Sequence, residues 1–279
     1  MKIGRLDALI VIIVVMIIVA LTAAEQGLPA QYAAEVDLAV DALTDADVAP
    51  RETNGWVTLQ LNRKSYSVPN LVRSLPRSLD RHPVPVIANL GPQRSAVGLA
   101  RGVDRNYHVW QSFLQSYVPF ATDNIWLPLL VLANRKRYAF DHDVYRLGSD
   151  GDIWQTSREA FSLPRGDCED HAILLADWLI GLGENARVAV GTMSGGGHAW
   201  VVLFRDGKEY VLEATQKHGV AGLKSWPLAR TKPEYQPRFQ FNREHFWVNT
   251  RAAATVRYRD ERWELRSSFR SSSRSSSRS

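Results

Sequence analysis

The stretch Gly166–Ala172, which reads GDCEDHA, contains the single cysteine among 279 residues and decides the fold that we expect. Apolar residues follow it with the i, i+3, i+4, i+7 spacing of one helix face. The Gly-Asp pair before the cysteine offers a turn and an N-cap, and Gly181 and Gly183 offer a stop. The sequence therefore predicts that Cys168 lies at the N-terminus of a helix.

The residues after this helix read as β-strands. We expect a short strand at 187–191, a glycine-rich loop at 194–197 and a strand at 198–204. Asp206-Gly207 is a hairpin turn signal, and 209–215 reads as the return strand. A helix followed by antiparallel strands indicates the α+β fold class.

The hairpin register brings a second and a third reactive group to one face of the sheet. If Asp206-Gly207 is a two-residue turn, His198 and Glu213 are diagonal neighbours, with Cβ atoms separated by roughly 7 Å. A thiol, an imidazole and a carboxylate are the parts of a nucleophilic triad. We therefore predict Cys168, His198 and Glu213 as catalytic residues. His171, three residues after the cysteine, is the alternative base, although we expect it on the helix surface.

The acidic residues around the cysteine complicate this prediction. A helix N-terminus lowers the pKa of a thiol, whereas Asp167, Glu169 and Asp170 in the same turn disfavour the thiolate. Their oxygens are also the ligands that calcium prefers. Zinc held by Asp167, Cys168, His171 and His198 is a weaker alternative, because a second cysteine is missing. The predicted chemistry itself requires no cofactor.

Composition limits the classes of partner. The formal charge is +5, but the tail from Arg266 to Ser279 contains four arginines and no acid. The remaining chain is close to neutral, which argues against a nucleic-acid-binding face. We expect no nucleic-acid partner.

The segment Ala8–Ala24 contains 17 consecutive uncharged residues. As a helix it would be roughly 25 Å long, at the short end of what spans a bilayer. Lys2 and Arg5 precede it, so we expect a single-pass inner-membrane anchor with the catalytic part on the periplasmic side. A cleaved signal peptide is the competing interpretation. In an exported protein a lone cysteine forms no internal disulfide, so Cys168 is a free thiol.

We divide the chain into four parts by composition and pattern. Two apolar stretches, 107–117 and 125–134, have helical spacing, and the proline-rich stretch 69–92 is typical of an irregular connector. The parts are a membrane or signal segment (1–25), a linker and N-terminal region of unknown role (26–104), a catalytic domain (105–265) and a disordered Arg/Ser tail (266–279).

The stretches 152–156 (DIWQT) and 166–170 (GDCED) resemble the transglutaminase-like superfamily, in particular the bacterial transglutaminase-like cysteine proteinases. The resemblance covers about 140–216 and implies a papain-like core, in which the helix that carries the cysteine packs on an antiparallel sheet. It implies Cys168 as nucleophile, His198 as general base and acid, and Glu213 as orienting carboxylate, where the family usually has Asp.

The same resemblance extends to the surroundings of the thiol. Some periplasmic members bind calcium through the acids that flank the cysteine, which are Asp167 and Glu169 here. An oxyanion hole would use the backbone N–H of Cys168, helped by Trp154 or Gln155.

The expected function is that of a membrane-anchored, periplasm-facing thiol hydrolase. It would cleave a peptide or amide bond in a protein or peptide of the cell envelope through an acyl-enzyme on Cys168. Transfer of the acyl group to an amine, and a non-catalytic domain that binds protein or cell-wall peptide, are the alternatives.

Overall fold

The computed structural model describes residues 51–53, 56–61, 67–91, 95–147, 151–216 and 226–269. The predicted membrane segment Ala8–Ala24 lies outside these ranges. Within them, no helix combines the length and the apolar character that crossing a membrane requires.

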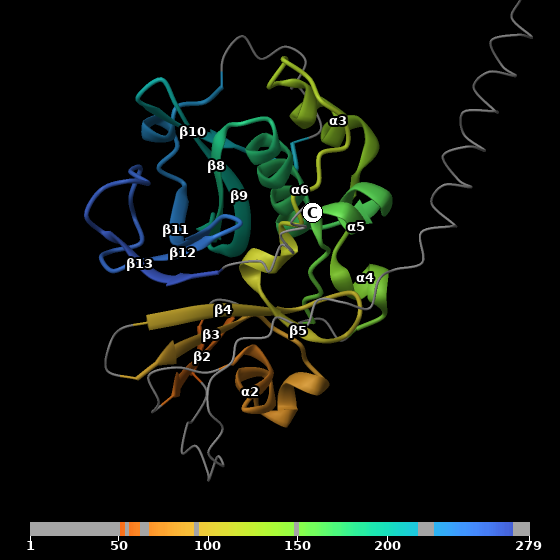
Figure 1. Cartoon of the computed structure of the whole chain (residues 1–279), viewed down its shortest axis with the longest axis vertical. Coiled ribbons are helices and arrows are strands. Elements are labelled where there is room, and N and C mark those ends of the chain that lie inside the picture. The colour runs from red at the N-terminus through yellow and green to blue at the C-terminus, as the bar shows by residue number, and fades with distance from the viewer. Residues whose placement is uncertain are drawn as a thin grey trace, which may run out of the picture. The chain divides into compact units, whose positions relative to one another are not determined.

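The first part of the described chain forms a five-stranded sheet with the order β1-β2-β3-β4-β5 (Figure 1). Strands β2 and β3 pair in parallel, and the other neighbours are antiparallel. The short helix α2 (Val68–Arg73) and the 3-10 turn η1 (Arg77–Asp80) cover one face of this sheet through Leu71 and Leu79. The strands are β1 (Arg51–Thr53), β2 (Trp56–Leu61), β3 (Val86–Leu90), β4 (Ser95–Arg101) and β5 (Tyr107–Val109).

The second sheet has six antiparallel strands in the order β10-β9-β8-β11-β12-β13. Its strand β9 is buried on both faces, because Val201 and Leu203 belong to the core that contains α6, while Trp200 and Val202 pack in a second cluster on the other face. The strands are β8 (Asn185–Met193), β9 (Gly196–Arg205), β10 (Lys208–Leu212), β11 (Tyr235–Phe241), β12 (His245–Asn249) and β13 (Trp263–Ser268).

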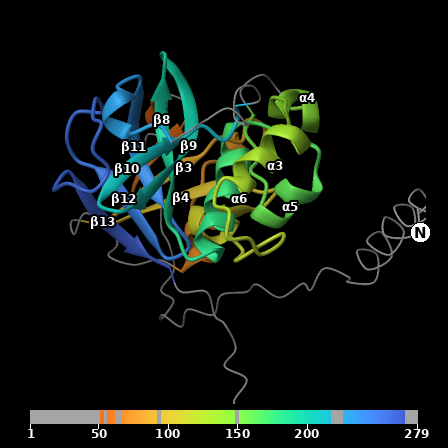
Figure 2. The same cartoon turned by 90° about the horizontal axis from the view of Figure 1, so that it is seen from above.

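The helix α6 (Cys168–Gly181) packs on β8 and β9 and is buried along most of its length. Figure 2 shows α3 and α5 on the side of α6 that faces away from the six-stranded sheet. Inside this helix Asp177 is neutralised by Arg243, whose Nε donates to its carboxylate at 2.6 Å. The other elements are η2 (Trp110–Phe113), α3 (Leu127–Arg135), β6 (Arg137–Tyr138), α4 (Asp141–Tyr145), α5 (Ser157–Ser162), β7 (Arg165–Gly166) and η4 (Ala229–Thr231).

One hydrophobic core joins the two sheets and α6. Trp110, at the end of the first sheet, contacts Phe239, Phe241 and Phe246 of the second sheet with ring centroids 5.4–5.7 Å apart. Trp154 lies against Trp110 at 4.9 Å. Backbone bonds connect the same regions, because Trp154 N donates to Arg101 O at 2.8 Å. The first sheet therefore covers one side of the core in which α6 is buried.

The hairpin register is the one that the sequence predicts. Arg205 pairs with Lys208, and Val201 pairs with Leu212. Asp206 and Gly207 both have positive φ, 50° and 70°, as a two-residue turn of the primed type requires. A capping box of Thr156 with Glu159 opens α5. The α+β fold class with the cysteine-bearing helix on an antiparallel sheet is thus observed.

Other expectations were wrong. Residues 107–117 form β5 and η2, not a helix, because Tyr107–Val109 pair with β4. The proline-rich stretch contains α2, η1 and β3 instead of an irregular connector. Strand β13 continues to Ser268, three residues into the segment predicted as a disordered tail, where Arg266 pairs with Glu264.

Candidate active site

The cysteine occupies the place that the sequence assigns to it. Cys168 is the first residue of α6 and is partly buried. Asp167 is the N-cap residue by position, but its side chain makes no capping hydrogen bond. The first amides of a helix have no partner within the helix. The side chain of Asp167 therefore leaves the amides beside the thiol without a cap.

His198 and Glu213 meet as the register predicts, although β10 ends at Leu212 and Glu213 lies directly after the strand instead of inside it. His198 Nε2 lies 2.8 Å from Glu213 Oε2. Glu213 also accepts from Thr215 N at 3.0 Å, from Thr215 Oγ1 at 2.6 Å and from the hydroxyl of Tyr235 at 2.9 Å. Burial alone would raise the pKa of Glu213, but the bonds from His198 and Thr215 outweigh it and lower the pKa to about 2. This carboxylate is ionised and fixes one nitrogen of the imidazole.

The thiol is not hydrogen-bonded to the imidazole in this structure. Its side-chain partner among the described residues is Glu169 Oε2, at 3.5 Å. Burial and the charge of Asp167 raise the pKa of Cys168, and a backbone hydrogen bond from Ala199 acts in the opposite direction. Since Ala199 follows His198 directly, the thiol lies against the strand that carries the imidazole. Nδ1 of His198 is the nitrogen that remains for the thiol.

His171 is not the surface residue that the sequence suggested. Its side chain is fully buried, and Nδ1 lies 2.6 Å from the carbonyl oxygen of Asp167. This bond stabilises the turn that carries Cys168. A buried ring with this bond is a poor alternative base.

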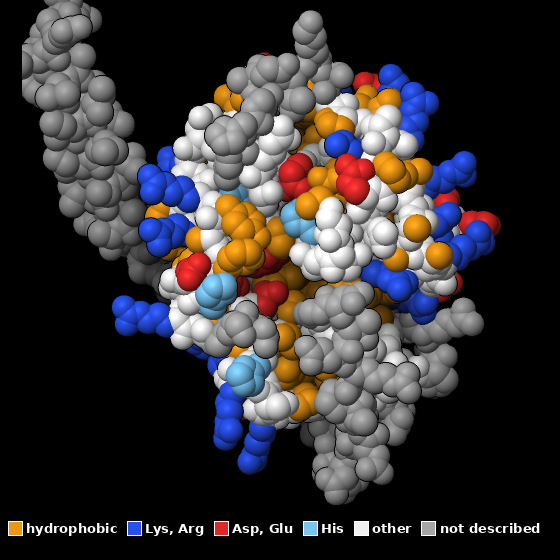
Figure 3. Space-filling model, turned by 180° about the vertical axis from the view of Figure 1, so that it is seen from behind, with side chains coloured by type: hydrophobic (Ala, Val, Ile, Leu, Met, Phe, Trp, Pro, Cys, Tyr) orange, Lys and Arg blue, Asp and Glu red, His pale blue; other side chains and the backbone are white. Residues whose placement is uncertain are grey.

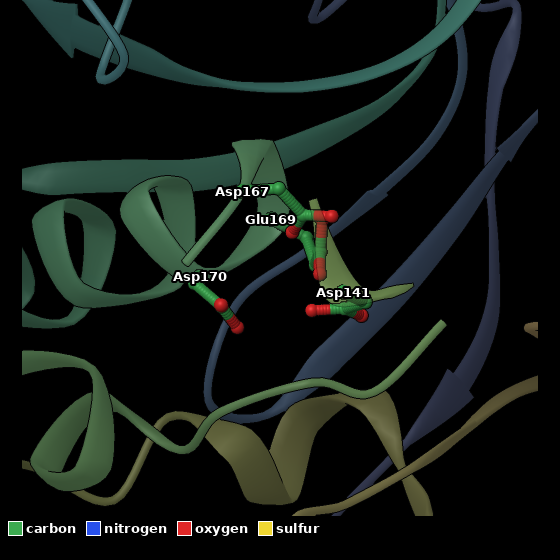
Figure 4. Close-up of side chains that lie close together, drawn as sticks. All are labelled: Asp141, Asp167, Glu169 and Asp170. Atoms are coloured by element: carbon green, nitrogen blue, oxygen red, sulfur yellow. The ribbon is translucent and has the colours of Figure 1, made fainter. Parts of the chain in front are cut away.

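Four acids converge on the other side of the thiol. Asp167 and Glu169 point from the start of α6 toward Asp141, the first residue of α4 (Figure 4). With Asp170 they form a group whose ligand oxygens all lie within 4.8 Å of one another. Burial raises the pKa of all four, that of Asp141 to about 10, and the charge of Asp167 raises the pKa of the other three further.

Each acid of this cluster has a carboxylate oxygen without a hydrogen-bond partner. One carboxylate oxygen of each of the four is buried without a hydrogen-bond partner, as is Oδ1 of the neighbouring Asp152. Buried polar atoms without partners are rare, because each costs about 1–3 kcal/mol. Calcium binds oxygens at about 2.4 Å, so opposite ligands of one ion lie about 4.8 Å apart. The cluster therefore fits a calcium ion in oxygen type, number and spacing.

A buried lysine faces the same acids. Lys136 Nζ donates to Gln155 Oε1 at 2.8 Å and to the carbonyl oxygens of Leu163 and Arg165. Gln155 Nε2 donates to the hydroxyl oxygen of Tyr145 and to the carbonyl oxygen of Arg165. This amide is therefore not free to serve the predicted oxyanion hole. The ring of the other candidate, Trp154, belongs to the core.

Glycine at 166 is required by close packing. A Cβ there would collide with the Asp170 carboxylate and approach Lys136 Cε to 2.9 Å. The sequence gives little indication that Lys136 and Asp141 belong to the site, because they lie about thirty residues before the cysteine. They reach it through the parallel pair β6 and β7.

One face of the molecule carries side chains of different character. Figure 3 shows hydrophobic side chains gathered beside histidines, next to a hollow in which acidic side chains are visible. Apolar and acidic groups therefore meet on one face of the molecule.

Comparison with known proteins gives a partial match. Residues 152–268 match the family model described as the CEP76 peptidase-like domain. This range includes Cys168, His198 and Glu213. The chain is similar to mouse centrosomal protein of 76 kDa, with 34% identity over 125 residues, which are 39% of this chain and 18% of that protein. It is also similar to human protein CC2D2B, with 42% identity over 65 residues, or 23% and 4%.

The chain spans less than a fifth of the length of either relative, so the similarity concerns one region of each. Among solved structures, calcium-bound LapG of Legionella pneumophila aligns with a TM-score of 0.37 and 18% identity, over 50% of this chain and 76% of that chain. What these comparisons establish is that the C-terminal part of this chain, with the candidate site, is similar to a peptidase-like domain.

Proposed function

We propose that this chain is a cysteine peptidase or amidase of the transglutaminase-like type. The observation that carries the proposal is the bond between His198 Nε2 and Glu213 Oε2, beside a thiol at the start of α6. A carboxylate on one imidazole nitrogen places the proton there and leaves the other nitrogen as a base. Three groups in fixed roles are what a thiol hydrolase requires.

In the proposed reaction His198 Nδ1 removes the proton of Cys168, and the sulfur attacks the carbonyl carbon of a peptide or amide. The uncapped amides at the start of α6 stabilise the negative charge on the carbonyl oxygen. His198 then gives the proton to the leaving amine, and an acyl-enzyme remains. Water, activated by the same imidazole, releases the acid and restores the thiol.

Calcium is the proposed occupant of the acidic cluster. Asp141, Asp167, Glu169 and Asp170 would hold it. Bound there, the ion would supply positive charge that offsets the carboxylates and lowers the pKa of the thiol. Burial and the charge of Asp167 raise the pKa of Cys168, whereas an active thiol must reach the thiolate at neutral pH, so a cation held by the unpartnered oxygens beside it would favour the reaction.

We place the catalytic part outside the cytoplasm, anchored by Ala8–Ala24 in the inner membrane. The uncharged run and the preceding Lys2 and Arg5 support this location. The substrates would be proteins or peptides of the cell envelope. Labelling of cysteines introduced at position 60 and position 3 with a membrane-impermeant reagent, in a Cys168→Ser background, tests it. Labelling at position 3 alone would contradict the proposed orientation.

The contact of the Cys168 thiol with Glu169, and not with His198, favours a second candidate, a non-catalytic domain that binds peptide. The rate of alkylation of Cys168 by iodoacetamide at neutral pH separates the two. For an enzyme we expect faster alkylation than for free cysteine, further acceleration by millimolar calcium, and a loss in His198→Ala. The matched control is His108→Ala, a partly exposed histidine in the first sheet. A rate equal to that of free cysteine and insensitive to His198→Ala would favour the binding domain.

Activity gives the second test. Incubation of the full chain with envelope proteins should produce fragments that are lost in Cys168→Ala, a variant that keeps the fold because Cys168 is only partly buried. The same fragments in Cys168→Ala would refute the mechanism.

A further inference from the structure

Two exposed aromatic side chains lie close to the thiol. Tyr138 and Phe140 are 42% and 54% exposed. Over the residues that the structure describes, only Phe120 and Leu265 are comparable large hydrophobic side chains at the surface. Single exposed hydrophobic residues are ordinary, but two in contact beside a candidate site indicate binding.

Strand pairing sets the position of this pair. Tyr138 is the partner of Gly166 in the parallel pair of β6 and β7, and Ala139 N donates to Gly166 O at 3.0 Å. Gly166 is two residues from Cys168. The backbone therefore fixes Tyr138 directly beside the turn that delivers the nucleophile.

Ring contacts extend this arrangement into a shelf, by which we mean Tyr138, Phe140 and His142. Tyr138 stacks on the buried ring of His171 with centroids 6.3 Å apart. Phe140 meets Tyr138 edge to face at 5.4 Å, and His142 stacks on Phe140 at 5.5 Å. Since His171 is itself bonded to the Asp167 carbonyl, the shelf is anchored to the turn that carries Cys168.

Electrostatics agrees with the geometry. Burial and then the charge of Cys168, followed by those of Asp167 and Glu169, raise the pKa of Tyr138. The hydroxyl therefore lies within electrostatic reach of the thiol. The ring of Phe140, which is more exposed, is the outer part of the shelf.

We propose that Tyr138 and Phe140 form a specificity subsite, which binds a large apolar side chain of a peptide substrate next to the bond that Cys168 attacks. This inference rests on the proposed function. The occupant is a peptide residue such as phenylalanine or leucine, because aromatic faces bind apolar groups and other rings. Tyr138 pairs with Gly166, two residues before Cys168, so a side chain bound on the shelf would adjoin the reacting carbonyl.

Peptidyl chloromethyl ketones test the subsite without a known substrate. Their sulfur alkylation is balanced, because the thiolate displaces chloride from the methylene carbon and forms a thioether. The probes are acetyl-Phe-Gly and acetyl-Ala-Gly chloromethyl ketone, together with the pair in which the order of the two residues is reversed. The second-order rate at Cys168 of the calcium-supplemented full chain is measured for each probe and divided by the iodoacetamide rate of the same variant.

We expect a preference for the phenylalanine probe of about tenfold in at least one order, which is the usual discrimination of an apolar pocket. The preference should fall to about one in Phe140→Ala and Tyr138→Ala. It should persist in the control Leu265→Ala, which removes an equally exposed apolar side chain on β13. Thermal unfolding of each variant shows that the fold is kept.

Two results would overturn the inference, and they are distinguishable. Labelling of Cys168 with no preference, or with a preference that survives in both shelf variants, removes the subsite but leaves the enzyme. A Cys168 that reacts with iodoacetamide and with every probe no faster than free cysteine removes the proposed function and the subsite with it.

Discussion

A single carboxylate and a cluster of carboxylates lie near Cys168, and they differ in how many of their oxygens accept hydrogen bonds. Glu213 receives hydrogen bonds from His198, Thr215 and Tyr235, and its pKa is lowered to about 2. The acidic cluster around Asp141 has five unpartnered oxygens once Asp152 is included, and burial raises the pKa of each acid. The first carboxylate is complete within the chain. The second group is complete only with protons or with a cation, which makes it the part of the site that responds to conditions.

The largest effect should follow from Glu213→Gln. The amide can present its N–H to the imidazole and so stabilise the wrong tautomer, and we expect turnover to fall by about 10²–10⁴-fold. Steady-state cleavage of an envelope substrate measures this. Glu234→Gln, which changes an exposed carboxylate directly before β11, is the control. An unchanged rate would remove Glu213 from the site.

Calcium should have the next largest effect, and it acts on the other carboxylates. At about 100 times its dissociation constant a ligand adds about 2.7 kcal/mol, which corresponds to roughly 5–10 °C in Tm here. Thermal unfolding with calcium and with EGTA measures the gain. Magnesium should replace calcium poorly, because it requires a smaller octahedral site. Equal Tm values in calcium and EGTA would contradict the cation site.

The gain from calcium should increase with pH. The folded cluster retains protons that the unfolded chain releases above about pH 4, so the cation-free protein loses stability as pH rises toward the raised pKa values, about 10 for Asp141. Calcium competes with these protons. We expect a larger Tm difference at about pH 8 than at about pH 5. A difference that shrinks over this interval would show that protons and calcium do not share the cluster.

Asp141→Asn should affect stability less, and in two directions. Removal of one of four repelling carboxylates should stabilise the calcium-free protein by about 1 kcal/mol and abolish most of the calcium response. Asp143→Asn, two residues further along α4 and exposed, is the matched control and should change neither value. Destabilisation by Asp141→Asn with an intact calcium response would indicate that its bond to Ile153 N is its main role.

Tyr235→Phe should have the smallest effect. The loss of one hydrogen bond to an ionised group costs about 1.5–3 kcal/mol, and we expect the lower limit because Glu213 keeps its bonds from His198 and Thr215. This is less than the combined change in stability and calcium response that we expect for Asp141→Asn. Because Glu213 contributes stability that is present above its ordinary pKa and lost as pH falls through about 2, a weaker environment should move this loss to higher pH. Acid unfolding followed by tryptophan fluorescence measures the shift. Tyr210→Phe on β10 is the control, and an identical acid midpoint in both variants would contradict the prediction.

The same contrast explains which parts of the site the sequence can predict. His198 and Glu213 are linked by a two-residue turn, and such a turn fixes register within a few residues. Asp141, Lys136 and Tyr138 reach the thiol through a pair of two-residue strands, which carry no periodic signal. The helix prediction for 107–117 was wrong for a related reason. Its spacing fits a helix, but pairing with β4 outweighs the local pattern.

The shared core has a practical consequence for anyone who shortens this chain. The range matched by the family model begins at residue 152, yet Asp152 N and Trp154 N donate to Pro83 O and Arg101 O of the preceding sheet. A truncation at that boundary would also uncover Phe239, Phe241 and Phe246 where Trp110 now covers them. The fragment would expose these apolar rings and be prone to aggregate, so a stable truncation must keep the first sheet.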